Sequence, residues 1–206
     1  MNPAWYARLQ AWLMATLGAH HSRRVSARKQ ELLGALRGRV LEIGPGGGVN
    51  FEFYAASDVE WLGVEPNPFA HPRLLAAAAQ HGVRATLLEG SAERLPVPDQ
   101  SVDAVVSTLV LCSVSDPAVA IAEVRRVLKP GGRFVFIEHV AAPRSSVLRR
   151  VQRAVRAPWR VAGGGCEPDR ETWRLIEQGG FSRVKFEHFR VPLPVVSPHV
   201  AGMAVR

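Results

Sequence analysis

A glycine-rich turn after an apolar stretch constrains the fold of this chain more than any other feature. Residues 40–43 are apolar apart from Glu42, four of the five residues 44–48 are glycine, and a segment that can form a helix follows from Val49. Glycine has no Cβ, so a backbone of this composition turns tightly and lets a ligand approach closely. The pattern predicts a strand, a ligand-binding loop and a helix in succession.

The spacing of these glycines distinguishes between two kinds of nucleotide-binding turn. A dinucleotide-binding turn has its third glycine five positions after the first, and the residue five positions beyond Gly44 is Val49. Alternate positions instead carry one acid and three glycines, which are Glu42, Gly44, Gly46 and Gly48. Glu65 ends the next apolar stretch, about 20 residues beyond Gly44, where a carboxylate can accept hydrogen bonds from a ribose diol. A nucleoside ligand is predicted, and Glu65 alone does not identify which one.

Apolar stretches alternate with helix-forming segments along the chain. The expected strands are residues 39–43, 59–64, 85–88, 102–111, 133–140, 183–191 and 200–205. The expected helices are residues 3–17, residues 20–36, a segment through Phe51, Phe53 and Tyr54, one that ends near Gln80, one from Asp116-Pro117 to residues 129–132, a basic one within residues 143–160 that ends near Pro158-Trp159, and one from Asp169 to Gly179. Strands that alternate with helices through short loops form parallel sheets covered on both faces. We therefore predict an α/β fold with a doubly wound, mostly parallel, Rossmann-like sheet.

Composition limits the kind of protein and its location. A chain of 206 residues can form one good core, and no apolar run approaches the roughly 20 residues that span a bilayer. The N-terminus has no basic region before its apolar part, and Arg8 interrupts that part, so a secretory signal is not expected. Two cysteines provide no disulfide framework and fit a reducing compartment. We expect a cytoplasmic protein.

Five further stretches, together with the motif at residues 42–48, resemble one protein family. They are residues 101–106 with 108–114, residues 126–132, residues 138–142, residues 165–166 with 170–173, and residues 198–199. They look like the class I S-adenosylmethionine (SAM) methyltransferases, and specifically resemble the alkyl thiol methyltransferases of the methyltransferase-like group, which are membrane-associated in animals. The resemblance runs from about Lys29 to the C-terminus. It implies SAM as cofactor, S-adenosylhomocysteine as product, and a seven-stranded sheet whose last strand is antiparallel.

The resemblance also implies a set of cofactor-binding residues. The glycine loop (Gly44, Gly46 and Gly48), with Glu42 and Asn50, corresponds to the amino-acid part of SAM, Glu65 and Pro66 to the ribose, Ser91, Ala92 and Glu93 to the adenine edge, and Thr108 and Leu109 to the gap between methyl group and acceptor. Two positions depart from the family pattern. Pro45 stands inside the glycine loop, and Ser91 stands where many members have an aspartate that holds the adenine amino group.

The N-terminal region differs from that of the family's animal members, which begin with a longer hydrophobic anchor. Here the first helix, residues 3–17, is short and carries Trp5 and Trp12. Three interpretations stay open: a lid over the cofactor cleft, a helix in a membrane interface, or a helix packed on the body of the domain. We assign residues 1–36 to N-terminal helices that form a lid or an interfacial segment, and residues 37–206 to the methyltransferase domain.

The acceptor implied by the resemblance is a small-molecule thiol, or an amphiphilic acceptor reached by peripheral membrane contact. Thiols have a pKa near 8.5, so a general base contributes only roughly tenfold at neutral pH. His139, just beyond a strand, is the candidate base because histidine titrates near neutral pH. Cys112 and Cys166 are interpreted as packing residues, and their spacing from the histidines predicts no metal site.

Two alternatives remain. Within the enzyme class, the acceptor could be a phospholipid amine or a phenolic hydroxyl. In a different class, the net charge of +8 and the arginines of residues 144–160 suggest an RNA-binding or RNA-modifying protein. The Asn-Pro-Pro-aromatic phrase of base-amine methyltransferases is absent after residues 102–111, and 23 of the 26 basic residues are arginine, which a coding preference also produces. Nucleic acid is therefore disfavoured as a partner.

Overall fold

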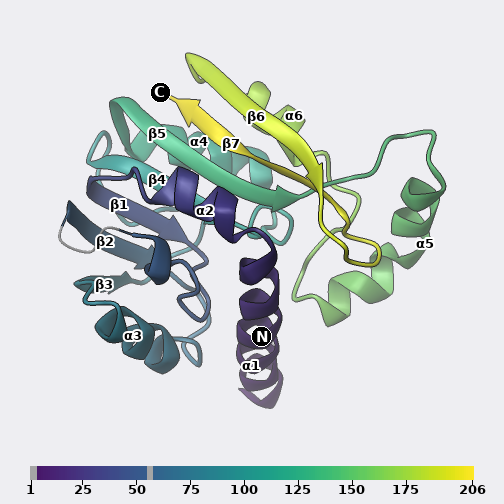
Figure 1. Cartoon of the computed structure of the whole chain (residues 1–206), viewed down its shortest axis with the longest axis horizontal. Helices are drawn as coiled ribbons and strands as arrows, with labels where there is room; N and C mark the ends of the chain where they lie inside the picture. Colours follow the sequence, from purple (N-terminus) through teal and green to yellow (C-terminus); the bar gives the residue numbers. More distant parts are fainter. Residues whose placement is uncertain (1–3, 55–57) are drawn as a thin grey trace.

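A seven-stranded sheet forms the centre of the molecule (Figure 1), in a computed structural model that describes residues 4–54 and 58–206. Its strands are β1 Gly38–Ile43, β2 Val59–Val64, β3 Ala85–Leu88, β4 Val102–Thr108, β5 Leu128–His139, β6 Arg183–Arg190 and β7 Pro198–Val205. The order is β3-β2-β1-β4-β5-β7-β6, the first five strands are parallel, and β7 is antiparallel to both of its neighbours. The predicted doubly wound, mostly parallel sheet is confirmed.

Helices cover both faces of this sheet. They are α1 Ala4–Arg24, α2 Ser26–Leu33, the 3-10 turn η1 Phe51–Phe53, α3 His71–Gln80, α4 Pro117–Val127, α5 Val147–Ala162 and α6 Thr172–Glu177. The core against α4 and α6 contains Leu41 of β1, whereas the core against α2, η1 and α3 contains its neighbour Val40. Strands buried on both faces are apolar at successive positions, which explains why β1 and β4 read as continuous apolar runs. Leu33 and Leu36, which precede the predicted boundary at residue 37, lie in the second core.

The first helix is longer than predicted. We expected it to stop at Gly18, but α1 continues through Gly18 to Arg24, and the chain bends only at Val25. A glycine inside an exposed helix costs about 1 kcal/mol relative to alanine. Contacts on both sides of Gly18 offset that cost, because Ala15 packs near Gly47 and His21 contacts His199.

The segment after the glycine loop is the second difference. The expected helix through Phe51, Phe53 and Tyr54 is only the single turn η1, and residues 55–57 lie outside the described part of the chain. Phe51, Phe53 and Tyr54 are all buried, and the Tyr54 hydroxyl reaches inward to Glu42. A helix with one solvent-facing side cannot bury three such neighbouring side chains, so the chain turns into the core instead.

Smaller differences concern the ends of other elements. β4 ends at Thr108 rather than residue 111, because Leu109 adopts a positive φ of 59° and turns the chain away. α6 begins at Thr172 rather than Asp169, whose carboxylate instead faces Arg156 at 3.8 Å. α5 continues past the expected end near residue 158 to Ala162. The predicted cap of α4 is confirmed, since Asp116 accepts hydrogen bonds from the backbone of residues 118 and 119.

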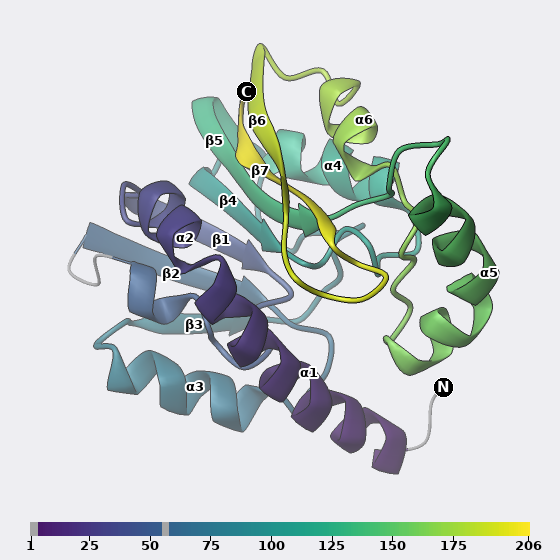
Figure 2. The ribbon, with the colours of Figure 1, turned by 45° about the vertical axis from the view of Figure 1, so that its right-hand side comes forward.

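Two helices lie beyond the carboxyl ends of the parallel strands. α1 crosses the loops that follow β1 and β2, and its start lies beside the end of α5 (Figure 2). The Tyr6 hydroxyl donates a hydrogen bond to the Val161 carbonyl at 2.6 Å, and Asn67 donates from Nδ2 to the Ala7 carbonyl at 2.9 Å. Among the helices of residues 4–54 and 58–206, none is long and apolar enough to cross a membrane.

Candidate active site

The glycine loop after β1 makes a cradle at the carboxyl edge of the sheet. Gly44, Gly46 and Gly48 have positive φ values of 58°, 54° and 78°, a region that other residues adopt only at a cost. A Cβ added to Gly44 would lie 2.8 Å from Val110, and one added to Gly48 would lie 2.7 Å from Phe51. A Cβ on Gly46 would meet nothing within 4 Å. Gly44 and Gly48 therefore allow close packing against Val110 and Phe51, whereas Gly46 faces open space.

Glu42 lies beneath this loop and is buried. Its carboxylate accepts hydrogen bonds from Asn50 Nδ2 at 2.7 Å, from the Tyr54 hydroxyl at 2.7 Å and from Trp61 Nε1 at 3.0 Å. Burial raises the pKa of Glu42, and the three hydrogen bonds oppose that rise. Glu42 thus ties β1, the turn after the glycine loop and β2 together. Sequence reasoning grouped it with the cofactor-binding residues but found neither Tyr54 nor Trp61.

Asn50 connects this network to the end of β4. Besides its bond to Glu42, its Nδ2 atom lies 3.1 Å from Thr108 Oγ1. Its Oδ1 atom is buried and has no hydrogen-bond partner within the described chain. Buried polar atoms are nearly always paired, so an unpaired amide oxygen beside the glycine loop is available to a ligand.

Glu65 stands at the end of β2, opposite the loop. Its carboxylate accepts hydrogen bonds from the Gly46 backbone at 3.0 Å and from the Asn67 backbone at 2.9 Å. The second bond follows from the turn that Pro66 begins. The structure therefore places Glu65 and Gly46, predicted for the ribose and the amino-acid part of the ligand, in direct contact.

The loop after β3 contributes less open surface than the sequence suggested. Ala92 is buried in the core, and Ser91 pairs with Arg94 in a tight turn. Glu93 accepts hydrogen bonds from the backbone of Ser115 at 2.9 Å and Asp116 at 3.4 Å. Partial burial acts to raise the pKa of Glu93, but these and neighbouring hydrogen bonds have the larger combined effect. The pKa of Glu93 therefore lies below its usual value. The Glu93 carboxylate thus fixes the loop between β4 and α4.

Leu109, next to Thr108, adopts a left-handed backbone conformation with φ of 59°. Such strain in a residue with a side chain is concentrated at functional sites. The Leu109 amide donates to the Ile137 carbonyl at 2.9 Å, which holds the turn against β5. Below it, buried Glu138 accepts hydrogen bonds from Ser107 Oγ at 2.6 Å and the Val110 amide at 3.1 Å. Burial raises the pKa of Glu138, a residue that sequence reasoning did not single out.

Known proteins share this architecture and sequence. A methyltransferase-domain family model matches residues 41–136. Thiol S-methyltransferase TMT1B of Rattus norvegicus is 38% identical over 209 residues, which cover 95% of this chain and 85% of that protein. Thiol S-methyltransferase TMT1A of Homo sapiens is 36% identical over 199 residues, which cover 90% and 81%. The chain is a class I SAM-dependent methyltransferase. The solved structure of YcgJ from Bacillus subtilis has the same fold, with 20% identity and a TM-score of 0.62. The matched region covers 90% of this methyltransferase and 96% of the YcgJ chain.

SAM is therefore the cofactor of this methyltransferase, and its acceptor is a small molecule. The cradle fits this cofactor, because Gly46 faces open space and the Asn50 amide oxygen beside it is unpaired. The resemblance to class I SAM methyltransferases is confirmed. The role of each individual residue in binding SAM stays a prediction.

Beyond β4 and β5, the methyltransferase brings together three residues that the sequence did not connect. His139 Nε2 lies 3.0 Å from Cys166 Sγ, and Cys112 completes a buried group. Trp159 Nε1 donates to Cys166 Sγ at 3.3 Å. Hydrogen bonds from Cys112 and then from His139 lower the pKa of Cys166 to about 4, whereas the pKa of Cys112 is raised well above its usual range by its bond to Cys166 and by burial. His139 thus contacts Cys166. Its role as the general base stays a prediction.

A second pair of histidines joins α1 to β7 of the methyltransferase. His21 and His199 are buried, and their Nε2 atoms are 2.9 Å apart. His199 Nδ1 lies 3.0 Å from the Ser197 carbonyl, which can only accept, so this nitrogen carries the proton and His21 donates between the Nε2 atoms. Burial, then the mutual repulsion of the two rings, lowers the pKa of His21 to about 3, and burial lowers that of His199 to about 4.

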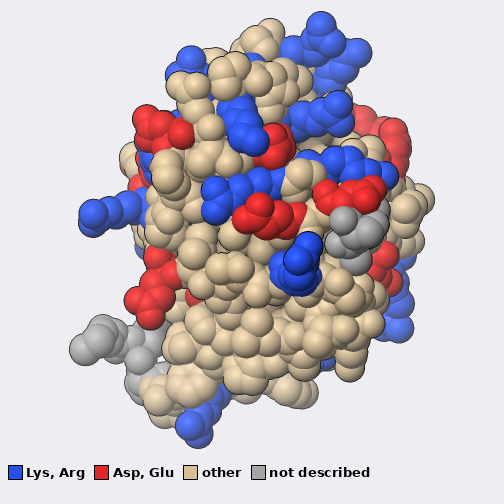
Figure 3. All heavy atoms as spheres, turned by 90° about the vertical axis from the view of Figure 1, so that its left-hand side faces the viewer, with Lys and Arg blue, Asp and Glu red and all other residues tan. Residues whose placement is uncertain are grey.

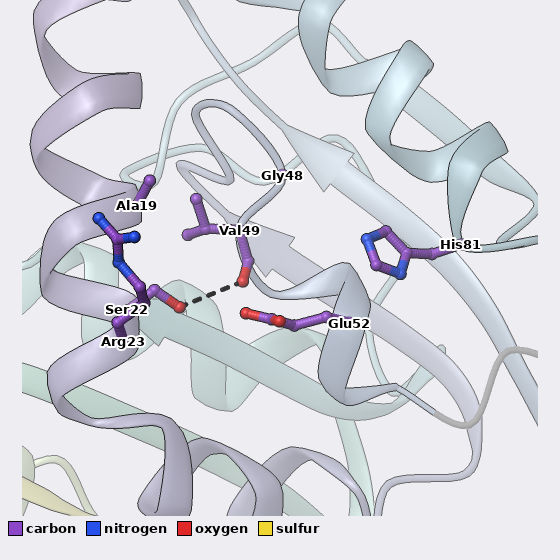
Figure 4. A pocket seen from close by; sticks show the side chains of 7 residues that line it. All are labelled: Ala19, Ser22, Arg23, Gly48, Val49, Glu52 and His81. Atoms are coloured by element: carbon purple, nitrogen blue, oxygen red, sulfur yellow. Dashed lines mark hydrogen bonds between the residues drawn. The ribbon is translucent and has the colours of Figure 1, made fainter.

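Two cavities flank α1 in the methyltransferase. One of about 320 Å³ lies between α1 and the turn after the glycine loop (Figure 4), and of the predicted site residues only Gly48 lines it. The other, of about 670 Å³, lies between the start of α1, the loop after β4 and the loop after α5. Its lining includes Trp5, Tyr6, Ser113, Val114, Val161 and Gly165. The second cavity is lined by residues 113–115 of the loop after β4, and loops at the carboxyl ends of the strands are where ligands bind in this type of sheet. Thr108 and Leu109, predicted for the acceptor gap, do not line it.

Proposed function

We propose that this enzyme transfers a methyl group to the sulfur of a small apolar thiol. The observation that carries the proposal is near full-length similarity, at 38% identity over 95% of the chain, to a protein named as a thiol S-methyltransferase. The cavity of about 670 Å³ offers such a thiol apolar surface from Trp5, Val114 and Val161. Its lining also includes the charged side chains Arg160, Glu167 and Arg170.

The acidic and basic groups at the acceptor end favour a thiol over an amine or an alcohol. Glu138 is fully buried and its carboxylate faces Ser107 and Val110, so it is not placed to deprotonate an acceptor. An amine or phenol, with a pKa of roughly 10, needs such a base, whereas a thiol ionises near 8.5. Glu167 lines the cavity, but its carboxylate is paired with Arg156 and Arg170. A site whose carboxylates are buried or paired in this way suits a thiol best.

SAM, when bound, supplies an electrophilic methyl group on a sulfonium centre. We propose that the glycine loop and Glu65 hold its amino-acid and ribose parts, and that Ser91 and Glu93 border the adenine. Thr108 and Leu109 border the gap in which the acceptor sulfur is oriented. Orientation of two reactants can supply several kcal/mol of barrier lowering, and α1 excludes water by covering the loops after β1 and β2.

Products identified by mass spectrometry test this proposal. The full chain is incubated with SAM and, in parallel, hexanethiol, hexylamine, 4-butylphenol and phosphatidylethanolamine. We expect the methyl thioether of hexanethiol, at a rate far above the other products. Methylation of the amine, the phenol or the lipid with no thioether would refute the thiol assignment and leave a methyltransferase for another acceptor.

The nucleic-acid alternative loses its main support in the structure. Four of the six arginines between residues 144 and 160 form ion pairs with acids that follow in the chain: Arg144 and Arg149 with Glu171, and Arg156 and Arg160 with Glu167. Basic and acidic side chains are also interleaved on the face shown in Figure 3. Paired charges make a weaker field than the uninterrupted basic patch that marks nucleic-acid binding.

A further inference from the structure

A group of three metal-binding side chains lies at the acceptor end of the site. Cys112 comes from the loop after β4, His139 ends β5, and Cys166 follows α5. One ligand atom from each lies within 4.8 Å of the other two. The side chains are only 2%, 5% and 9% exposed, respectively. Distant parts of the chain thus converge on one small buried volume with two sulfur atoms and one imidazole nitrogen.

The backbone around Cys166 is adapted to bring the two cysteines together. The Glu167 amide donates to the Cys112 carbonyl at 2.9 Å, which joins the two loops directly. Gly165 has φ of 96°, and a Cβ there would lie 2.9 Å from the Ser113 carbonyl. A Cβ at Gly163 would lie 3.1 Å from the Cys166 Cβ. The run of glycines at residues 163–165 therefore lets the loop after α5 approach the loop after β4 closely.

The chemistry of these ligands selects a particular metal. Two thiolates and one imidazole match the ligand set of tetrahedral zinc, with Zn–S near 2.3 Å and Zn–N near 2.0–2.1 Å. Such bonds place an imidazole nitrogen and a thiolate roughly 3.5 Å apart, so the 3.0 Å between His139 Nε2 and Cys166 Sγ needs to widen only slightly. Two thiolates also neutralise Zn²⁺, which keeps the buried site free of net charge.

We propose that Cys112, His139 and Cys166 bind one Zn²⁺ ion whose fourth position receives the acceptor thiol. Three protein ligands with one open position characterise catalytic zinc, whereas structural zinc has four. Ser113 and Gly165, the chain neighbours of the two cysteines, line the cavity of about 670 Å³, so the proposed open position lies beside a space from which an acceptor thiol could approach. Trp159, which donates to Cys166 Sγ, is the outer partner that orients one ligand.

This inference rests on the proposed thiol specificity for the role of the fourth position. A thiol that coordinates zinc loses its proton: the S–H bond breaks, the proton leaves to solvent, and the sulfur lone pair forms the Zn–S bond. His139 then acts as a metal ligand in place of the base that the sequence suggested. Activation by coordination explains how a site whose carboxylates are buried, as in Glu138, or paired with arginines, as in Glu167, can present a thiolate at neutral pH.

Metal analysis of the purified full chain is the first test. After dialysis against a chelator and reloading with Zn²⁺ alone, we expect about one zinc per chain. Cys112→Ser, Cys166→Ser and His139→Gln should each weaken Zn²⁺ binding by more than the roughly 10–100-fold that loss of an outer partner costs. His188→Gln, which changes an exposed histidine of β6, is the matched control and should bind zinc as the unaltered chain does.

The absorption spectrum of Co²⁺ bound in place of Zn²⁺ reports the coordination geometry of the site without an activity assay. Co²⁺ alone should produce the strong visible bands of a tetrahedral site and a thiolate-to-metal band in the near ultraviolet. Hexanethiol should shift the visible bands, and hexanol should leave them unchanged. Absence of stoichiometric zinc together with an octahedral cobalt spectrum in the unaltered chain would overturn the inference, as would a disulfide between the two cysteines in protein purified under reducing conditions.

The two proposals fail in different ways. Tetrahedral metal binding with no methylation of hexanethiol would refute the thiol specificity and keep the metal site. Full methylation of hexanethiol by chelator-treated, metal-free protein would refute the metal's role and keep the thiol specificity. Loss of both metal and activity in Cys166→Ser, with circular dichroism unchanged, would support both.

Discussion

A single buried carboxylate organises the residues around the cofactor loop. Glu42 receives three hydrogen bonds from side chains of the loop, the following turn and β2, and all three donors, Asn50, Tyr54 and Trp61, are themselves buried. Without this carboxylate the buried donors would have no hydrogen-bond partner. An unpaired buried donor lowers the free energy of unfolding by more than a formed hydrogen bond adds to it. The position is therefore sensitive to the loss of one oxygen even when size is kept.

Glu42→Gln tests this role. The amide group would direct hydrogens at one or two of the three donors, so we expect a loss of about 1–3 kcal/mol of unfolding free energy. Thermal unfolding followed by circular dichroism measures it. Glu60→Gln, an exposed change on the neighbouring strand β2, should alter stability by less than about 0.5 kcal/mol. Equal effects of the two substitutions would contradict a special role for Glu42.

Gly46 and Gly44 make a second matched pair. Gly46→Ala adds a methyl group in open space, so it should lower stability by only the roughly 1–2 kcal/mol of a left-handed backbone while sharply weakening S-adenosylhomocysteine binding in calorimetry. Gly44→Ala adds a clash with Val110 and should destabilise the fold further. Retention of full affinity in Gly46→Ala would show that the ligand does not lie against this residue.

At the scale of elements, the contact between α1 and β7 depends on pH. One proton bridges the Nε2 atoms of His21 and His199, so a second would place two N–H groups face to face. Lys29 of α2 and His139 of β5 face His21 as well, and both add repulsion when charged. Burial lowers the pKa of His21 in the folded chain to about 3, well below its usual value of 6.5. Between these two values the unfolded chain binds a proton that the folded chain does not bind, so stability that is present above pH 6.5 is lost as the pH falls toward 3.

Thermal unfolding across pH measures this loss. At 1.5 pH units below the unfolded pKa, one such histidine costs on the order of 2 kcal/mol, equivalent to a fall in Tm of roughly 4–8 °C for a chain of this size. His21→Gln keeps a donor for His199 and removes one titrating group, so its Tm should fall less between pH 7 and pH 5. Identical slopes for His21→Gln and the unaltered chain would show that other groups control acid stability.

The sequence located best those elements in which consecutive residues are apolar because they are buried. β1, β2 and β4 are apolar because both faces are covered, and Asp116-Pro117 marks α4 by local capping. The errors lie where tertiary contacts override local preference, as at Gly18 within α1 and at Phe51–Phe53 after the glycine loop. The sequence could place the glycine loop, Glu65 and Thr108 at the ends of strands, and their roles in binding SAM stay predictions. The Cys112, His139 and Cys166 group was not, since its members come from three loops and no local spacing reports their convergence.

At the scale of the whole molecule, α1 presents an apolar surface to solvent. Trp5 is 66% exposed and Trp12 is 60% exposed, and Leu9 between them is exposed as well. An exposed apolar patch on a chain with net charge +8 suits contact with an anionic membrane surface. Peripheral contact would bring amphiphilic acceptors to the cavity that Trp5 lines.

Vesicle sedimentation tests the contact. Combined Trp5→Ser and Trp12→Ser substitutions should lower partitioning into vesicles of phosphatidylcholine and phosphatidylserine by roughly tenfold or more, because burying each ring contributes about 1.5–3 kcal/mol. Leu75→Ser, at an exposed position of α3, is the control and should bind as the unaltered chain does. Binding that vanishes in high salt and is unaffected by the tryptophan changes would point to charge alone.

The path of α1 has a further consequence for the order of events during turnover. The helix touches the loops after β1 and β2 at Gly47 and Asn67, and reaches the Val161 carbonyl through Tyr6. Detachment of the helix from these contacts would open the cradle for the spent cofactor to leave. We therefore expect the slowest event of each cycle to be a mechanical one, whose rate falls as solvent viscosity rises and which the reactivity of the thiol does not alter.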